Sequence, residues 1–295
     1  MKIGALEAGG TKMVLAIYNE KAEIEHTLTL PTETPDITVP KMQTFFNAHH
    51  LDALGIASFG PIDLVPHSPT YGYITSTPKL PWRNFPILSA LKGDRNIPVG
   101  FDTDVNVAAI AEVEQGVGMG YNNAIYITVG TGIGAGIYVN GQPVHGLIHP
   151  EVGHILLRPH ADDPLPKGVC PFHDGCLEGL ASGPALGARI QGDARTLPDN
   201  DPLFQLEAHY LAQMCVNLTL TLSPEIIILG GGVMARSALY KEIRKETQRL
   251  LQGYIQHERL LSKIGSYIVA PKLYPLSGLV GSYLIGKKAW DMANS

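Results

Sequence analysis

Two segments of the chain repeat one pattern, which is an apolar strand, a glycine turn and a second apolar strand. The first segment spans residues 3–18 and the second spans residues 124–139. A shift of 121 positions places Gly9 on Gly130 and Asn19 on Asn140. Because similar units in both halves of a chain are typical of duplicated folds, we expect two lobes built on one plan.

Other apolar runs extend this pattern. We predict strands at 54–59, 99–101 and 226–229, and helices at 105–113, 203–222, 235–251 and 278–294. Strands that alternate with helices favour an α/β fold. Residues 61–86 and 158–176 are rich in proline and are predicted to be irregular.

The composition narrows the functional class. The 295 residues suffice for two modest domains, and a net charge of −5 argues against a nucleic-acid surface, which needs a basic stripe. The chain opens without the basic and apolar regions of a secretory signal, and no apolar run reaches about 18 residues, so we expect no membrane span. Three cysteines fit a reducing compartment better than a disulfide framework, and we expect a cytoplasmic protein.

Three glycine turns, at 9–10, 130–134 and 230–232, each follow a predicted strand. Glycine lets backbone N–H groups approach an anion without a Cβ in the way, so the three turns could surround one nucleotide. Thr11, Lys12 and Thr131 would add hydroxyl donors and a positive charge. Taken singly, each turn also fits an ordinary hairpin.

The segment 170–176 carries the sharpest local signal. Cys170, His173 and Cys176 stand three residues apart, so two thiolates and an imidazole can converge on one ion. Zinc prefers four such ligands in tetrahedral geometry, and a closed structural site would order this loop. The candidate fourth ligand is His154, with His149, His145 and His160 as competitors. An open catalytic zinc and a loop with incidental cysteines are the alternatives.

Several carboxylates are candidates for chemistry. Asp102-Thr103-Asp104 lies between a predicted strand and a predicted helix. A carboxylate there can cap the helix or act as the general base of phosphoryl transfer, and spacing alone does not separate the two roles. Glu151, His154 and Glu178 are groups that can grip adjacent hydroxyls of a sugar, although any one of them alone is more often a surface charge.

Taken together, these motifs resemble the ROK family of sugar kinases, and within it the bacterial ROK fructokinases. The resemblance covers nearly the whole chain. Its motifs lie at residues 6–12, 101–106, 151–154, 170–178 and 229–233. It implies an actin-like ATPase (ribonuclease H-like) fold of two lobes with a cleft between them.

The resemblance also implies how the chain divides and assembles. A small lobe would comprise residues 1–115, joined by the C-terminal helix at 279–295. A large lobe of residues 116–278 would carry the zinc loop and the adenosine site. Family members commonly dimerise, so we expect a homodimer. The first glycine turn starts by residue 8, which leaves no room for the DNA-binding module of the family's repressors, and we expect no nucleic-acid partner.

The implied site follows residue by residue. Asp104 would be the catalytic base that takes the proton from the primary hydroxyl of the sugar, with ATP as co-substrate and Mg²⁺ as its cation. The residues expected to bind the sugar are Glu151, His154, Glu178, Gly60, Pro61 and Thr103. Those expected to bind ATP are Gly9, Gly10, Thr11, Lys12, Thr131, Gly132, Gly134, Gly231 and Gly232. The implied ligands of a structural Zn²⁺ are His154, Cys170, His173 and Cys176.

Two departures from the wider family bear on the substrate. Glu7 stands where many members carry the Asp that helps to organise Mg²⁺, and the zinc loop has fewer cysteines than in many glucose-type members. Both features resemble the fructokinase branch, as does Thr77-Pro78-Lys79 before Trp82. We therefore expect phosphorylation of D-fructose to fructose 6-phosphate. A kinase for glucose, mannose or an N-acetylhexosamine is one alternative, and a non-catalytic sugar sensor is another.

Overall fold

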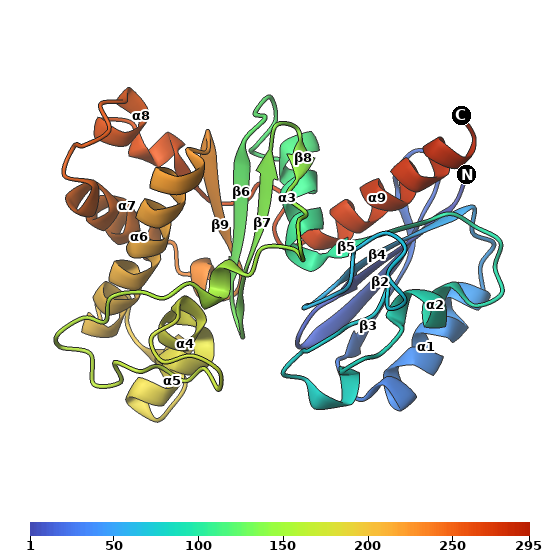
Figure 1. Ribbon diagram of the computed structural model, residues 1–295, viewed down its shortest axis with the longest axis horizontal. Helices are drawn as coiled ribbons and strands as arrows, with labels where there is room; N and C mark the ends of the chain where they lie inside the picture. Colours follow the sequence, from blue (N-terminus) through green and yellow to red (C-terminus); the bar gives the residue numbers. More distant parts are fainter. The chain divides into compact units, whose positions relative to one another are not determined.

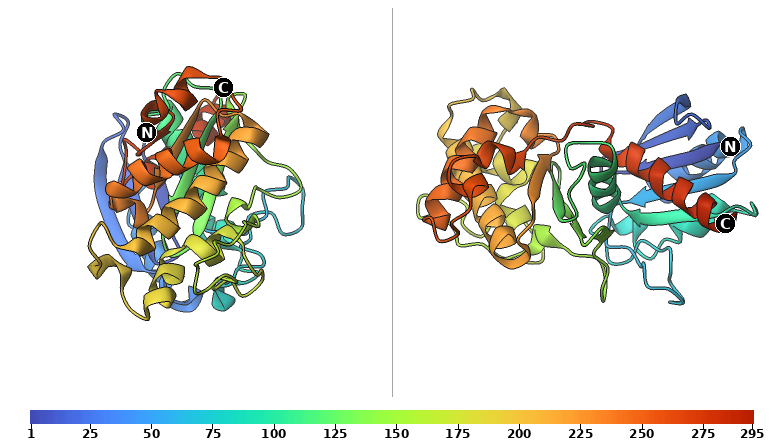
Figure 2. Two further views of the ribbon diagram at one scale, coloured as in Figure 1. Left: turned by 90° about the vertical axis from the view of Figure 1, so that its left-hand side faces the viewer. Right: turned by 90° about the horizontal axis from the view of Figure 1, so that it is seen from above.

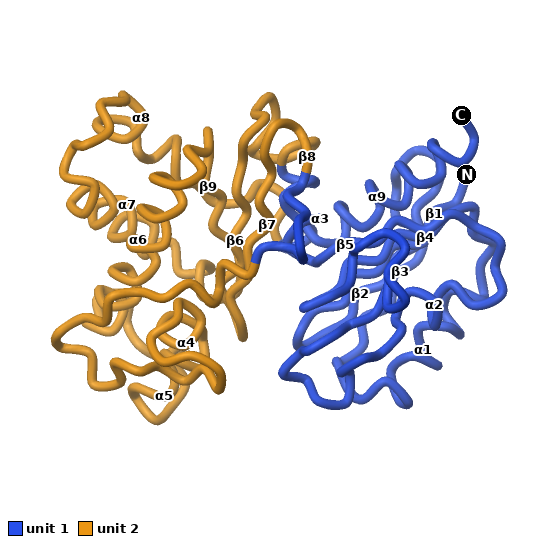
Figure 3. Tube along the Cα trace, in the orientation of Figure 1, with its two compact units in different colours: residues 1–112, 143–150, 275–295 blue, residues 113–142, 151–274 orange.

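The structure is a computed structural model that describes residues 1–295. The chain divides into two compact units (Figure 3). Unit 1 contains residues 1–112, 143–150 and 275–295, and unit 2 contains residues 113–142 and 151–274. Each unit is built on one five-stranded sheet with helices beside it, which confirms the predicted α/β class (Figure 1).

Unit 1 has the strand order β3-β2-β1-β4-β5. Its strands are β1 (Ile3–Ala8), β2 (Lys12–Tyr18), β3 (Ile24–Pro31), β4 (Ala53–Ser58) and β5 (Val99–Thr103). Its helices are α1 (Pro35–Asn47), α2 (Ile87–Lys92), α3 (Asp104–Glu114), which ends in unit 2, and α9 (Ser277–Ala293). The first two strands form an antiparallel hairpin, and β4 and β5 run parallel to β1.

The C-terminal helix α9 packs across β1, β4 and β5 (Figure 2). Its close approach depends on small residues. A Cβ on Gly55 of β4 would lie 1.7 Å from the carbonyl oxygen of Ser282, and one on Gly281 would lie 1.9 Å from that of Val107. Glycine is therefore required at both contacts, and α9 is fixed tightly against the strands that carry the acidic residues described below.

Unit 2 has the strand order β10-β9-β6-β7-β8. Its strands are β6 (Ala124–Val129), β7 (Ile133–Val139), β8 (Gln142–Pro143), β9 (Ile226–Gly230) and β10 (Ile268–Val269). Its helices are α4 (Leu177–Ala181), α5 (Gly183–Ile190), α6 (Pro202–Leu222), α7 (Ala238–Leu251) and α8 (Glu258–Leu261). Five 3-10 turns complete the chain, at Leu80–Trp82, Val152–His154, Ala194–Thr196, Val233–Ala235 and Ile264–Ser266.

The predicted duplication is visible in the pairing of the strands. A shift of 121 positions carries the bounds of β1 onto β6 and those of β2 onto β7. In both units the first strand pairs antiparallel with its hairpin partner and parallel with its other neighbour. The hairpins differ in their turns, because the last pair is Ala8 with Met13 in unit 1 but Val129 with Ile133 in unit 2.

The sequence patterns did not predict β3 or α1. β3 is a largely exposed edge strand, so it lacks the apolar run that identifies a buried strand. α1 contains Pro40 and begins at Pro35, and a proline within a window weakens the helical signal although Pro is favourable at a helix start. No helix has both the length and the apolar character to cross a membrane.

Candidate active site and metal centre

Two carboxylates, Glu7 on β1 and Asp104 at the start of α3, lie near each other in unit 1. Burial, followed by the charge of Asp104, raises the pKa of Glu7 to about 7, and Lys12 opposes this shift. Burial raises the pKa of Asp104 to about 6, although the backbone N–H of Val105 donates to its Oδ1 at 3.0 Å. A carboxylate with such a pKa can accept a proton close to neutral pH.

The two aspartates of Asp102-Thr103-Asp104 have different surroundings. Asp102 is buried, and its Oδ1 accepts hydrogen bonds from the backbone N–H of Thr103 and from Asn106 Nδ2, both at 2.7 Å. The hydroxyl of Thr103 accepts from the backbone N–H of Asn106 at 3.1 Å and so caps α3. The interpretation of either aspartate as the helix cap is therefore wrong, because Thr103 holds that position.

The first glycine turn of unit 1 is held from two sides. The backbone N–H of Gly9 donates to the carbonyl oxygen of Lys12 at 3.0 Å, and the Thr32 hydroxyl donates to that of Gly9 at 2.8 Å. Lys79, from the irregular region 61–86, lies beside the turn, because a Cβ on Gly10 would be 3.4 Å from its Cε. The turn is thus a fixed feature with two lysines close to it.

The second and third glycine turns line one pocket in unit 2. The pocket has a volume of about 820 Å³, and its lining includes Gly130, Thr131 and Gly232. Gly231 has φ +91°, and a Cβ there would lie 2.4 Å from the carbonyl oxygen of Val129, so only glycine fits this position. Two of the three predicted turns therefore meet in one cavity, while the first belongs to unit 1.

The other walls of this pocket come from α5 and from residues that sequence reasoning missed. The guanidinium of Arg236 stacks on the Phe204 ring at 4.0 Å from its centroid, and both line the pocket. The backbone N–H of Gly183, at the start of α5, donates to the carbonyl oxygen of Gly130 at 2.8 Å. No motif in the sequence marks Arg236 or Phe204, because their contact joins segments more than 30 residues apart.

Glu178 on α4 lies against the second glycine turn. Its Oε2 accepts the backbone N–H of Ile133 at 2.8 Å, and a Cβ on Gly132 would lie 2.7 Å from the same oxygen. The carbonyl group of the same Ile133 meets Gly153, because a Cβ on Gly153 would lie 2.0 Å from that oxygen. The turn at Val152–His154, which follows Glu151, is therefore packed directly on the strand that the glycine turn opens.

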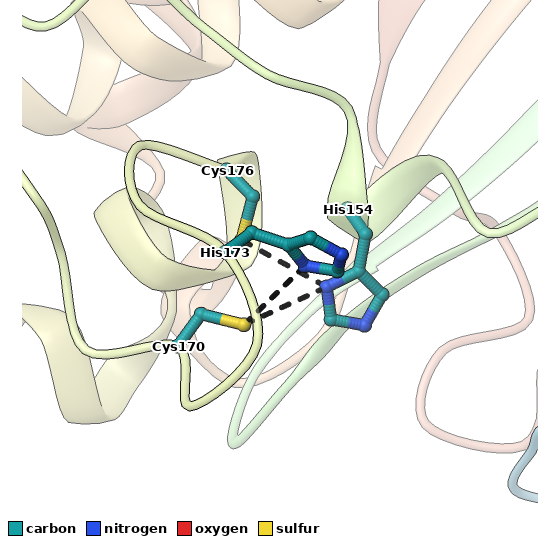
Figure 4. A group of neighbouring side chains, drawn as sticks. All are labelled: His154, Cys170, His173 and Cys176. Atoms are coloured by element: carbon teal, nitrogen blue, oxygen red, sulfur yellow. Dashed lines mark hydrogen bonds between the residues drawn. The ribbon is translucent and has the colours of Figure 1, made fainter. Parts of the chain in front are cut away.

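Four side chains of unit 2 converge on one point (Figure 4). They are His154, Cys170, His173 and Cys176, and one ligand atom from each lies within 4.8 Å of the other three. Cys170 Sγ is 3.7 Å from His173 Nδ1 and 3.9 Å from His154 Nδ1, and Cys176 Sγ is 3.8 Å from His154 Nδ1. Ligand atoms of a tetrahedral zinc site stand about 3.3–3.8 Å apart, so the donor set fits zinc, and the distances of 3.7–3.9 Å are close to this spacing.

The competing histidines lie elsewhere. His145 Nε2 is 2.9 Å from Asp102 Oδ2, and His149 Nε2 accepts the backbone N–H of Ile62 at 3.1 Å. His160 Nδ1 accepts the backbone N–H of Asp162 at 3.2 Å. Of the four candidates, only His154 is brought to the two cysteines.

The sequence profile described as ROK family matches residues 3–289. This chain belongs to the ROK family. A fructokinase from Pediococcus pentosaceus is 42% identical over 289 residues, covering 98% of this chain and 99% of that protein. A fructokinase from Lactococcus lactis subsp. cremoris is 43% identical over 268 residues, covering 91% and 90%.

Solved ROK structures share the architecture. The ROK family glucokinase from Streptomyces griseus, in complex with glucose and AMPPNP, is similar with a TM-score of 0.73 and 25% identity, covering 98% of this chain and 100% of that one. ROK kinases have the actin-like ATPase fold, so the predicted fold is confirmed.

Proposed function

We propose that this ROK protein is a fructokinase that transfers the γ-phosphoryl group of ATP to the primary hydroxyl of D-fructose, giving fructose 6-phosphate. The observation that carries the proposal is the identity of 42–43% with two fructokinases over at least 90% of the chain. The glucokinase of known structure is less similar, at 25% identity. The intact glycine turns and the acidic pair Glu7 and Asp104 support a catalytic protein.

Asp104 is the proposed general base. Its raised pKa, about 6, lets it accept the proton of the attacking hydroxyl as the bond to phosphorus forms. Asp102 does not suit this role, because both of its carboxylate oxygens already have hydrogen-bond partners. Glu151, His154, Glu178, Gly60, Pro61 and Thr103 are the proposed sugar-binding residues.

The glycine turns are proposed to bind the nucleotide. The pocket of about 820 Å³ beside Gly231 and Gly232 is large enough for adenosine, and Thr131 in its lining suits a phosphate. Gly132 and Gly134 would complete the phosphate contacts there. In unit 1, residues 9–12 are proposed to bind phosphate through their backbone N–H groups and the Lys12 ammonium.

Mg²⁺ fits the acidic pair of unit 1. Burial, followed by the charge of Asp104, raises the pKa of Glu7, and a divalent cation beside the two carboxylates would relieve the repulsion between them. When bound, Mg²⁺ neutralises charge on the transferring phosphoryl group. Glu7 would be a ligand, and its carboxylate packs closely on Gly278 of α9, because a Cβ there would lie 2.5 Å from Glu7 Oε1.

Zn²⁺ fits the cluster of His154, Cys170, His173 and Cys176, which we propose as a closed structural site. Four ligands leave no open position, so the ion would order the loop and not take part in chemistry. Its effect on the sugar would come through His154, whose position it would fix, and through Glu178, which follows Cys176 by two residues.

The proposed protein works in the cytoplasm, where ATP is available, as a homodimer. We propose a dimer because members of the family commonly form one. Light scattering of the purified protein would measure its mass in solution. A mass of one chain, 31.8 kDa, would contradict the dimer.

The function is tested by ADP release from Mg-ATP with fructose, glucose, mannose and N-acetylmannosamine offered separately. We expect a kcat/KM for fructose well above that for the other three sugars. Preference for another hexose would retain the kinase but overturn the assignment to fructose. Sugar binding without ADP release, in protein that contains zinc, would favour a sensor.

A further inference from the structure

His145 forms a partly buried pair with Asp102 that has no role in the reaction proposed above. It lies in the segment 143–150, which belongs to unit 1, and its Nε2 is 2.9 Å from Asp102 Oδ2. The Asp102 side chain is 7% exposed, whereas the His145 imidazole is 44% exposed. One edge of the ring is therefore anchored inside the unit while much of the rest is open.

The hydrogen bonds around Asp102 determine which ring nitrogen carries a proton. A carboxylate only accepts, so Nε2 of His145 must be the donor to Asp102 Oδ2. In the neutral ring Nδ1 then holds a lone pair, and in the charged ring it holds a second N–H. The hydrogen bond with Asp102 raises the pKa of His145. In either state Nδ1 is an oriented hydrogen-bonding group that a hydroxyl can meet.

The position of the pair relates it to the proposed base. Asp102 precedes Asp104 by two residues, and Thr103 between them is a proposed sugar-binding residue. The neighbouring Asn106 side chain is buried, and its Oδ1 has no hydrogen-bond partner. A buried amide oxygen without a donor is costly, and this one belongs to the amide whose Nδ2 donates to Asp102 Oδ1 at 2.7 Å.

The same segment also reaches the second group of proposed sugar contacts. His149, four residues after His145, accepts the backbone N–H of Ile62 at 3.1 Å. Ile62 directly follows Gly60 and Pro61. The segment 143–150 is thus anchored at two points, the end of β5 and the residues after β4, and both points adjoin residues proposed to bind fructose.

We infer that His145 is a specificity-determining residue whose Nδ1 bonds a hydroxyl of the bound ketohexose, while Asp102 fixes the orientation of the ring. The inference rests on the proposed fructokinase activity. His145 is not a zinc ligand, since its Nε2 bonds Asp102 and it lies outside the cysteine cluster. The competing explanation is that the pair only fastens the segment 143–150 to β5.

His145→Gln separates the two explanations. The terminal amide of glutamine reaches about as far as Nε2 and can still donate to Asp102, but nothing replaces Nδ1. If Nδ1 bonds a hydroxyl of fructose, His145→Gln should have a KM for fructose about tenfold higher than the wild type. Its KM for ATP and its melting temperature should be unchanged. We also expect fructose binding without ATP, measured by calorimetry, to weaken by the same factor.

His50→Gln is the matched control. His50 is also paired with a carboxylate, Asp52, at 3.4 Å, but it is 85% exposed and precedes β4 at the other end of the sheet. This variant should retain the KM for both substrates. His145→Leu, which also loses the anchor, should lower the melting temperature as well as fructose affinity.

A normal fructose KM in His145→Gln would overturn the inference and leave the anchoring role. Equal increases in the KM for fructose and for ATP would also overturn it. The wild-type assay on four sugars is run first, so that failure of the proposed substrate is seen separately. If the wild type prefers another hexose, the variant is measured on that sugar, and a tenfold higher KM there supports a sugar-reading role without fructose.

Discussion

The carboxylate of Glu178 accepts a hydrogen bond of 2.8 Å from the backbone N–H of Ile133, the first residue of β7. Glu178 lies two residues after Cys176, and Ile133 follows the second glycine turn. Gly153, next to His154, packs on the carbonyl oxygen of the same Ile133. The proposed zinc loop and the proposed phosphate turn therefore both contact the backbone of Ile133. A substitution that displaces one of them should also displace the other.

Gly132→Ala should disturb the contact between Glu178 and the backbone of Ile133. The added Cβ would lie 2.7 Å from Glu178 Oε2, so the carboxylate must move. We expect kcat/KM for fructose to fall by about 10- to 100-fold, because small displacements of positioning groups are costly. The control is Gly265→Ala in the same unit, where the nearest atom is 3.9 Å away, and it should retain activity. Equal activity of both variants would contradict the coupling.

Cys170→Ser should remove the metal, and Cys170 is not one of the proposed sugar-binding residues. Serine is a poor zinc ligand, so we expect elemental analysis to find about one zinc per chain in the wild type and well under one in the variant. The KM for fructose should rise about tenfold or more, because His154 and Glu178 lose their support. Cys215→Ala is the control, since Cys215 is buried outside the cluster. A fully active sample without zinc would contradict the structural role.

Asp104→Asn should abolish most turnover while fructose still binds. Asparagine is nearly the same size but cannot accept the proton, so we expect kcat to fall by about 10²- to 10⁴-fold. In the wild type, kcat should decline as the pH falls and the base becomes protonated. Burial raises the pKa of the Mg-free Asp104 to about 6, and bound Mg²⁺ would move the decline to lower pH. Stopped assays and calorimetry with fructose measure the two quantities. Turnover near the wild-type level would remove Asp104 from the role of base.

The same substitution should stabilise the fold at high pH. The pKa of Asp104 is raised from 3.8 to about 6, so the folded state binds its proton more tightly than the unfolded state. This stability is present below about pH 4 and is lost as the pH rises through 6. The free energy of unfolding of Asp104→Asn should exceed that of the wild type by about 3 kcal/mol at pH 8, at about 1.4 kcal/mol per pKa unit, and nearly equal it at pH 4. Urea titrations in Mg-free buffer test this, and a less stable variant at pH 8 would refute it.

Gly232→Val should weaken the binding of ATP without weakening the binding of fructose. Gly232 has φ −64° and a Cβ there meets no atom within 4 Å, so the variant should fold normally with its side chain in the pocket. We expect the KM for ATP to rise about tenfold or more while the KM for fructose changes little. Unchanged ATP kinetics in the folded variant would show that adenosine binds elsewhere.

Local patterns determined the strands that carry the glycine turns. A hairpin is encoded by alternating apolar residues around glycines, and the 121-residue repeat of this signal corresponds to β1–β2 and β6–β7. The spacing of Cys170, His173 and Cys176 was equally local, because three ligands on one loop need no distant partner. β3 was not predicted, because an exposed edge strand lacks the pattern of apolar residues that a buried face produces.

Contacts between distant segments were decided only by the tertiary structure. The spacing of the sequence left four histidines as candidates for the fourth ligand beside the cysteines. In the structure, Gly153 packs on Ile133, and His154, the next residue, lies at the cysteines. The pair of Asp102 and His145 and the bond of Glu178 to Ile133 have no sequence signal either. Periodicity records which face of an element is buried, whereas the partner of a polar side chain depends on the course of the loops, which local residue patterns do not specify.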